Sequence, residues 1–262
     1  MLTRNILPVI ILFSSSLRLV GQATEKKLDF KKKQLSAATI TLQCNRDVAD
    51  KALKDYFARK GIKPSSYKGL TVYKNYPFDS TSKVSNDLYF KLDKSSDATI
   101  VTLVPTQPGE DFETQVGADQ NAIDQSKTFL NKMAIVVGSF NTNVQLADQQ
   151  EALNKANKKL KGQLDDSTDL AKKIRNLQSD LDQNKNDLDK QKKVLDGIST
   201  TDFDAHQKAL KKLNGLSDDR GNLEKKLRKA QSDFDQNIQD MATQRQLIQK
   251  EQDALSAIKS RQ

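Results

Sequence analysis

The chain has 262 residues, of which 36% are hydrophobic and 29% are charged, and its net charge is +9. This composition is too polar for one globular core of that length. The basic excess is spread along the sequence, and the one concentrated cluster, residues 31–33, is too small for a nucleic-acid footprint. We therefore expect no nucleic-acid partner.

Residues 1–23 have the pattern of a secretory signal. Arg4 precedes an apolar core at 6–13, which is followed by serines at 14–16 and by a small-residue site at Gly21 and Ala23. The apolar run is far shorter than the roughly 20 residues that cross a bilayer. We predict cleavage near Ala23, export to the periplasm or the exterior, and no transmembrane span in the mature chain. The alternative is an ordinary N-terminal segment.

A small α+β domain is predicted over 38–143, after a Lys-rich tether at 24–37. Alternating apolar residues indicate a strand at 38–44, and a helical apolar period indicates a helix at 46–60. Further strands are predicted at 68–74, 87–93 and 98–104, and a second helix contains Ile123 and Val137. The order β-α-β-β-β-α suits a mostly antiparallel sheet that helices cover on one face.

Part of this domain, residues 50–78, resembles a group of known proteins. The residues concerned are Ala52, Leu53, Tyr56, Phe57, Lys60, Gly61, Lys68, Gly69, Val72 and Tyr73. The run is similar to uncharacterised exported bacterial proteins that pair a small α/β domain with a C-terminal coiled coil. The resemblance implies that architecture and export, and it implies no activity and no site residues.

The C-terminal half, 144–262, is predicted to form a long antiparallel coiled-coil hairpin. Apolar residues recur every seven positions from Leu146 to Leu195, and a second series runs from Leu213 to Leu255. A seven-residue repeat sustained over this length is typical of paired, supercoiled helices. The two series are out of phase, which indicates two helices rather than one.

The turn between these helices is predicted near 197–201. Gly197 suits a left-handed residue after a helix end, and Thr201 with Asp204 resembles a capping box. A second cluster of helix-breaking residues, at 214–221, keeps the heptad phase, so we interpret it as a weak spot within one helix.

The heptads also predict which residues face each other. Centred on the turn, they set Leu181 against Leu216 and Ala156 against Met241. This register brings Lys173 to Lys226, and a slide by one heptad would remove that repulsion. Exposed ion pairs contribute about 0 to 1 kcal/mol each, comparable with a helix cap, so we follow the caps.

The connection between the two halves lies at 138–143, where the apolar face of the second helix changes direction. We favour a nearly continuous helix through this segment. A hinge is the alternative, since Gly138, Ser139, Asn141 and Thr142 are poor helix formers.

No catalytic, cofactor or metal site can be assembled from the sequence, which holds one Cys and one His. Cys44 alternates with Ile40 and Leu42, so we expect it in the core of a strand, with an intermolecular disulfide as the alternative. His206 lies in the predicted hairpin, far from Cys44 in the sequence. We expect no cofactor and no enzymatic activity.

One aromatic-dense patch is a possible contact surface. Its residues are Tyr67, Lys68, Tyr73, Lys74, Tyr76 and Phe78. Tyrosine beside a cation is common at interfaces, so the patch could bind protein, peptide or an envelope glycan. The alternative is ordinary core and edge packing.

These expectations favour a non-enzymatic exported envelope protein. Its α/β head would be a docking or recognition module, and its hairpin a spacer or oligomerisation arm that binds a protein partner or a second copy. The alternative is an envelope-associated hydrolase or hydrolase regulator that acts through the head. A cleft with converging polar groups would favour the alternative.

Overall fold

A computed structural model describes residues 21–31, 33–78, 85–110, 112, 119–199 and 202–261. The chain divides into two compact units, one extending to Gln145 and the other covering Leu146–Arg261. We refer to them as the α/β unit and the hairpin unit. Helix α2, Gln120–Asp196, belongs to both and is continuous through 138–143, as the sequence favoured.

The predicted secretory signal lies almost wholly outside the described residues, so export and cleavage near Ala23 stay predictions. Within the described residues, none of the helices combines the length and the apolar character that a bilayer span requires.

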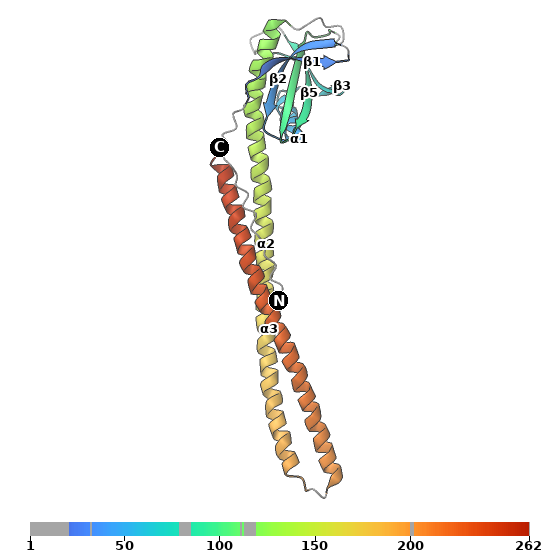
Figure 1. Cartoon of the computed structure of the whole chain (residues 1–262), viewed down its shortest axis with the longest axis vertical. Helices are drawn as coiled ribbons and strands as arrows, with labels where there is room; N and C mark the ends of the chain where they lie inside the picture. Colours follow the sequence, from blue (N-terminus) through green and yellow to red (C-terminus); the bar gives the residue numbers. More distant parts are fainter. Residues whose placement is uncertain are drawn as a thin grey trace. The chain divides into compact units, whose positions relative to one another are not determined.

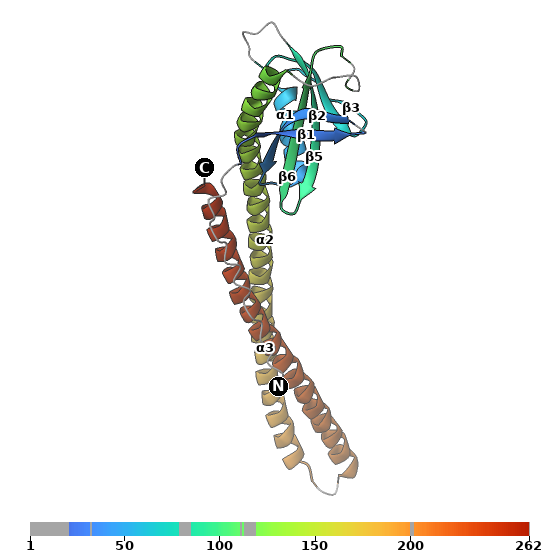
Figure 2. The same cartoon turned by 45° about the horizontal axis from the view of Figure 1, so that its top comes forward.

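The α/β unit is built on one six-stranded sheet (Figures 1 and 2). Its strands are β1 (Thr24–Phe30), β2 (Lys33–Leu42), β3 (Ser65–Tyr67), β4 (Leu70–Tyr76), β5 (Asn86–Ser95) and β6 (Ala98–Thr106). Their spatial order is β1-β2-β6-β5-β4-β3, and the described pairs are antiparallel. Helix α1, Arg46–Ala58, connects β2 to β3. The predicted fold class, a small α+β domain followed by long helices, is confirmed.

The prediction of a tether at 24–37 is wrong. This segment forms β1 and the beginning of β2, which pair with Leu28 opposite Leu35. Successive side chains of a strand point to opposite faces, so in the edge strand β1 Leu28 is buried while its charged neighbours stay exposed. The high charge of the segment concealed the strand. The short strand β3 was also not expected.

One face of the sheet is covered by α1 and the first turns of α2. Phe57 of α1 stacks on Tyr73 of β4, with ring centroids 3.7 Å apart, and both side chains are fully buried. Cys44 is buried in the same cluster, which confirms its predicted core position, although it lies two residues after the end of β2 rather than within a strand. Burial raises the pKa of its thiol, so the thiolate is disfavoured.

The other face carries a smaller apolar cluster. Phe112 packs there against Tyr89, with ring centroids 4.3 Å apart, and against Phe30 at 5.0 Å. The buried members are Leu28, Leu35, Ala37, Leu70, Val72, Tyr89, Val104 and Phe112. Both faces of this sheet therefore bury apolar side chains.

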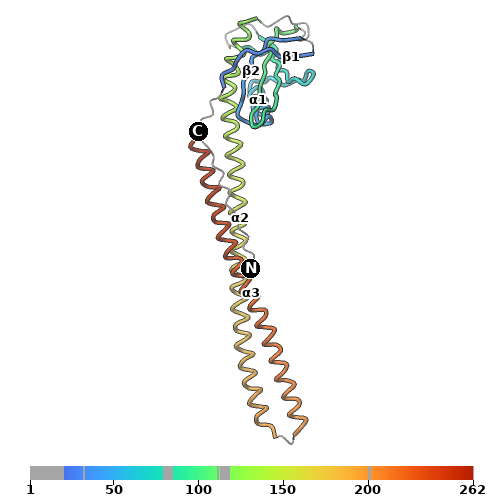
Figure 3. The backbone as a smooth tube through the Cα atoms, in the orientation of Figure 1, coloured from blue at the N-terminus to red at the C-terminus, as the bar shows by residue number. Residues whose placement is uncertain are grey.

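In the hairpin unit α2 pairs with α3, Phe203–Lys259, and the two run antiparallel (Figure 3). Helix α2 ends at Asp196, close to the predicted turn, and Gly197 follows without the left-handed backbone that we expected. The predicted cap, Thr201, lies outside the described residues. Asp202 caps α3 instead, since its side chain accepts a hydrogen bond from the Ala205 N–H at 3.1 Å.

Helix α3 is continuous through 214–221, as predicted, but the register differs from the heptad alignment. Asn184 donates to the carbonyl of Leu216 at 3.1 Å, where Leu181 was expected, and Gln244 donates to that of Ala156 at 2.9 Å, where Met241 was expected. In both pairs, the residue that meets the partner lies three positions after the residue that the heptads predicted. Side chains lean toward the N-terminus of their own helix, so in an antiparallel pair the residues that meet are displaced from those level with each other.

Candidate functional site

Strand β4 is irregular just before the candidate site. A bulge lies between Tyr73 and Tyr76, and Asn75 within it has a left-handed backbone with φ of 55°. The Asn75 N–H donates to Oδ1 of Asp87 at 2.9 Å. In a regular strand, residues three apart point to opposite faces, so the extra residue allows both tyrosines to pack in the helix-covered core.

A shallow cavity of about 470 Å³ opens beside the end of β4. We refer to it as the aromatic groove; it is lined by Tyr76, Phe78, Asp124, Gln125, Thr128, Phe129 and Lys132. Tyr76 is the last residue of β4, and Phe78 follows that strand. The other lining residues belong to the first turns of α2. All of the lining lies within the α/β unit.

The floor of the aromatic groove consists of rings that contact each other edge to face. The ring centroids of Tyr76 and Phe129 are 5.3 Å apart, and those of Tyr76 and Phe78 are 5.9 Å apart. Tyr76 is 6% exposed and Phe129 is 5% exposed, whereas Phe78 is half-buried. Little of the Tyr76 and Phe129 rings is therefore accessible in the groove, and Phe78 is the most accessible of the three.

Its rim is polar because one face of α2 carries hydrophilic groups. Asp124, Thr128 and Lys132 follow each other at four-residue steps, so they lie in a row along the helix. Lys127 forms an ion pair with Asp124 and lowers the pKa of that carboxyl group. The rim thus offers an ionised carboxylate, an amide, a hydroxyl and an ammonium group.

The tyrosine in the floor stays protonated at neutral pH. Burial is the main cause that raises the pKa of Tyr76, and its hydrogen bond with Tyr56, at 2.9 Å between the hydroxyl oxygens, acts in the same direction. A neutral phenol suits binding through apolar contact and hydrogen bonding.

The structure does not bring the six residues of the predicted contact surface together. Tyr67 packs with Phe112 on one side of the sheet. The Lys68 ammonium lies 5.1 Å from the ring centroid of Tyr67. Tyr73 is core, and Lys74 is exposed. Tyr76 and Phe78 are the two that reach the aromatic groove.

Phe129 and the polar rim were missed by sequence reasoning. The sequence pattern placed Ile123 and Val137 on this helix and did not include Phe129. The available signal was an aromatic residue four positions after Gln125 and three before Lys132, on an amphipathic helix.

The one cysteine and the one histidine of the sequence belong to different units. Cys44 lies in the α/β unit and His206 in the hairpin unit. Nowhere in the described ranges do three or more His, Cys, Asp or Glu side chains approach closely enough to hold a metal ion.

The sequence matches no protein-family model, and a search of curated proteins finds no match. The geometry of the two units therefore carries the functional argument.

Proposed function

We propose that the chain is a non-enzymatic exported docking protein of the cell envelope. The α/β unit is the docking module and binds its partner in the aromatic groove. The α2–α3 hairpin is a spacer or an oligomerisation arm. The aromatic groove is the observation that carries this proposal, because it combines an apolar floor with a rim of hydrogen-bonding and charged groups in one cavity.

The groove favours a peptide over a glycan. Sugars stack on exposed ring faces, whereas Tyr76 and Phe129 are almost fully buried. Apolar rings at the bottom of a cavity suit an inserted apolar side chain. Asp124 and Lys132 on the rim can then bind charges on either side of that side chain.

Panning a random peptide library on the intact chain tests the docking module. We expect enrichment of peptides with an apolar residue flanked by charged ones. Phe78→Ala should weaken their binding at least tenfold, since Phe78 is the most accessible ring of the groove.

The matched control is Phe203→Ala, which removes a 69% exposed phenylalanine at the start of α3. It should leave binding unchanged. An equal loss in both variants, or competition by envelope oligosaccharides in place of peptides, would contradict the proposal.

Export and the role of the hairpin have separate tests. N-terminal sequencing of the envelope fraction should find a chain that begins near Thr24, and an uncleaved cytosolic product would refute export. Light scattering distinguishes the two arms of the proposal: a single-chain mass indicates a spacer, and a multiple of that mass indicates an oligomerisation arm.

A further inference from the structure

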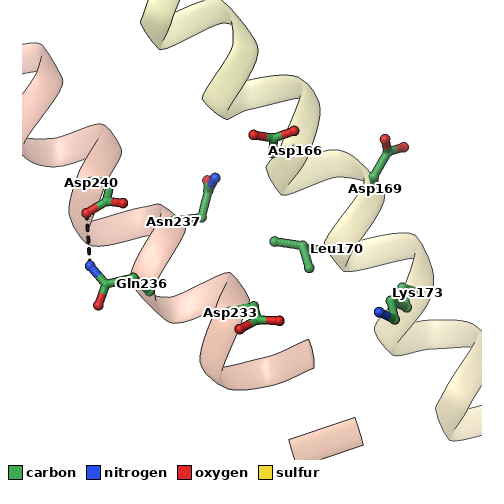
Figure 4. A pocket seen from close by; sticks show the side chains of 8 residues that line it. All are labelled: Asp166, Asp169, Leu170, Lys173, Asp233, Gln236, Asn237 and Asp240. Atoms are coloured by element: carbon green, nitrogen blue, oxygen red, sulfur yellow. Dashed lines mark hydrogen bonds between the residues drawn. The ribbon is translucent and has the colours of Figure 1, made fainter. Parts of the chain in front are cut away.

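The two long sides of the hairpin unit differ in composition. On one side, the residues that lie three positions after the seam are all charged over the middle of both helices. We refer to this as the charged side; its residues are Asp166, Lys173, Asp180 and Asp187 of α2 and Asp219, Lys226, Asp233 and Asp240 of α3. Two open hollows, of about 400 and 470 Å³, are lined by these residues from both helices, so the two stripes share one side (Figure 4). We expect the charged side to face water.

The opposite side carries exposed apolar residues. Six large apolar side chains of the hairpin unit are exposed in the described ranges, and four of them belong to this side. They are Leu164, Phe203, Leu210 and Ile238, which are 37% to 69% exposed. Leu210 directly follows the buried Ala209, and Phe203 and Ile238 lie whole heptads from Leu210. One step along a helix turns by about 100° and three steps by about 300°, so these residues and the charged stripes flank the seam on opposite sides.

The hydrogen bonds across the seam set the level of each apolar residue. Gln191 donates to the carbonyl of Ala209 at 3.2 Å, and Leu210 lies one residue beyond that level. Four heptads further from the turn, the same register sets Leu164 level with Ile238. The exposed apolar residues therefore form two groups, one near the turn and one about 40 Å away along the hairpin.

Between the two apolar groups the same side is polar and nearly neutral. Its residues at the heptad steps are Ala171, Gln178 and Lys185 of α2 and Ser217, Glu224 and Gln231 of α3. Together with the four exposed apolar residues, we refer to them as the apolar side. Lys185 and Glu224 differ in level by one heptad, about 10 Å, so they do not pair within one chain. The Glu224 carboxylate accepts instead from Arg220 of its own helix at 3.0 Å, on the surface.

The apolar side is complementary to a second copy of itself. A two-fold rotation about an axis through its polar middle sets Phe203 of one copy against Leu164 and Ile238 of the other. The same rotation sets Lys185 of each copy against Glu224 of the other. Because the rotation is two-fold, each contact occurs twice. Apolar groups therefore meet at both ends of this arrangement, and opposite charges meet in its middle.

The length of the apolar side suits a stable interface. From Leu164 to the level of Phe203 it spans about five heptads, or about 50 Å at 1.5 Å per residue. Two helices, each about 10 Å wide, present about 1000 Å² over that length, which exceeds the roughly 800 Å² that each partner buries in a typical specific interface. Pairing also removes four exposed large apolar side chains of each chain from water.

We propose that the apolar side binds a second copy of this chain, so that two hairpins pack as a four-helix bundle with two-fold symmetry. The charged sides then lie on the outer surfaces. This inference rests on the oligomerisation role in the proposed function, and it assigns that role to a defined surface. It does not involve the aromatic groove, so peptide binding and dimer formation can fail separately.

The mass in solution gives the first test. Light scattering of the full chain should give twice the single-chain mass. Leu164→Glu with Ile238→Glu should give the single-chain mass, because it places four carboxylates in the apolar ends of the dimer. The helical circular dichroism should not change, since both residues are exposed in the single chain.

The matched control is Val194→Glu with Leu247→Glu. These two residues are also exposed, and each lies three positions after a buried amide of the seam, Gln191 or Gln244, as the charged side does. The control makes the same change of charge and should leave the dimer intact. An equal loss of the dimer in both double variants would overturn the proposal.

A charge swap tests the middle of the interface. Lys185→Glu and Glu224→Lys should each raise the dissociation constant of the dimer about tenfold, because each brings like charges together at two places. The two changes combined should restore the wild-type value. A combined variant as weak as the single variants would show that these residues do not meet.

Introduced cysteines test the symmetry. Leu164→Cys with Phe203→Cys should form a covalent dimer on oxidation, because the two positions lie about 50 Å apart within one chain. The native Cys44 is buried and should not interfere. Neither single variant should form a covalent dimer.

Two further results would overturn the proposal. One is a single-chain mass of the wild type at every concentration, which would make the hairpin a spacer and leave the docking module as proposed. The other is a covalent dimer from Leu164→Cys alone, which would place the two-fold axis elsewhere.

Discussion

The two units hold their buried groups in different ways. The α/β unit buries its apolar side chains in two clusters, one on each face of the sheet, and in the larger cluster Phe57 contacts Tyr73, Tyr76, Phe90 and other rings. The hairpin unit buries residues along a narrow seam that includes one small apolar cluster, and three of its buried residues, Asn184, Gln191 and Gln244, are amides. One substitution can therefore disrupt the first unit, whereas the second distributes its stability over many layers.

The amides of the seam have a role that leucines cannot fill. Asn184, Gln191 and Gln244 each donate to a backbone carbonyl of the opposite helix, at 2.9 to 3.2 Å. Leucines tolerate a slide by a heptad, because each meets another apolar residue. A hydrogen bond across the seam does not, so the amides select one register.

The largest expected effect is that of Phe57→Ala. It should destabilise the α/β unit by about 3 to 5 kcal/mol, since it removes a fully buried ring and leaves a cavity. Urea unfolding followed by tyrosine fluorescence measures this loss. Most of the helical circular dichroism should persist at the urea concentration where the fluorescence changes. Simultaneous loss of both signals would show that the units do not differ in this way.

High pH should also act on the α/β unit first. Burial raises the pKa values of Tyr73 and Tyr76, so the folded state holds protons that the unfolded state releases above about pH 10. The stability from these tyrosines is fully present below that pH and is lost as the pH rises. Absorbance at 295 nm should show two of the five tyrosines ionising together with unfolding. Five tyrosines that ionise reversibly near pH 10 would contradict this.

In the hairpin unit, Asp202→Ala should cost about 1 kcal/mol, because it removes the side-chain acceptor that caps α3. Thermal unfolding followed at 222 nm measures the change. Asp204→Ala, which removes the other acidic residue of the first turn, is the control for charge alone. Equal effects of the two variants would assign the stabilisation to charge rather than to the cap.

The smallest effect is expected for Gln244→Leu. The carbonyl of Ala156 lies within α2, so it keeps the hydrogen bonding of the helix when the donor of Gln244 is lost. The leucine side chain fills the seam. The free energy of unfolding should change by about 1 kcal/mol or less, in the stabilising direction. Gln244→Ala should instead destabilise. If both variants destabilised equally, the hydrogen bond itself would be the main contribution.

The sequence predicts the long-period features of this chain well. The heptad repeats predicted both helices of the hairpin unit, because a repeated pattern depends little on any single residue. The helix-ending and capping residues predicted the region of the turn. The helix-covered face of the sheet followed from alternation in strands such as β5.

Local exceptions were beyond the sequence pattern. Strand β1 was missed because its charged residues outweigh Leu28, and the shared orientation of Tyr73 and Tyr76 depends on a bulge that strict alternation excludes. The groove could not be predicted because it joins β4 to Phe129 of α2, which are distant in the sequence. The register was wrong because heptads do not include the lean of side chains along each helix.

The strand order sets the sequence in which the chain can fold during synthesis. Strand β2 has β1 on one side and β6 on the other, and its pairing with β6 joins Ala38 to Leu103. A ribosome must therefore deliver more than fifty further residues before β2 gains its second neighbour, whereas the β1–β2 pair closes over a two-residue gap. Until then the inner edge of β2 is open to other strands, so this interval is when a nascent chain is most exposed to mispairing.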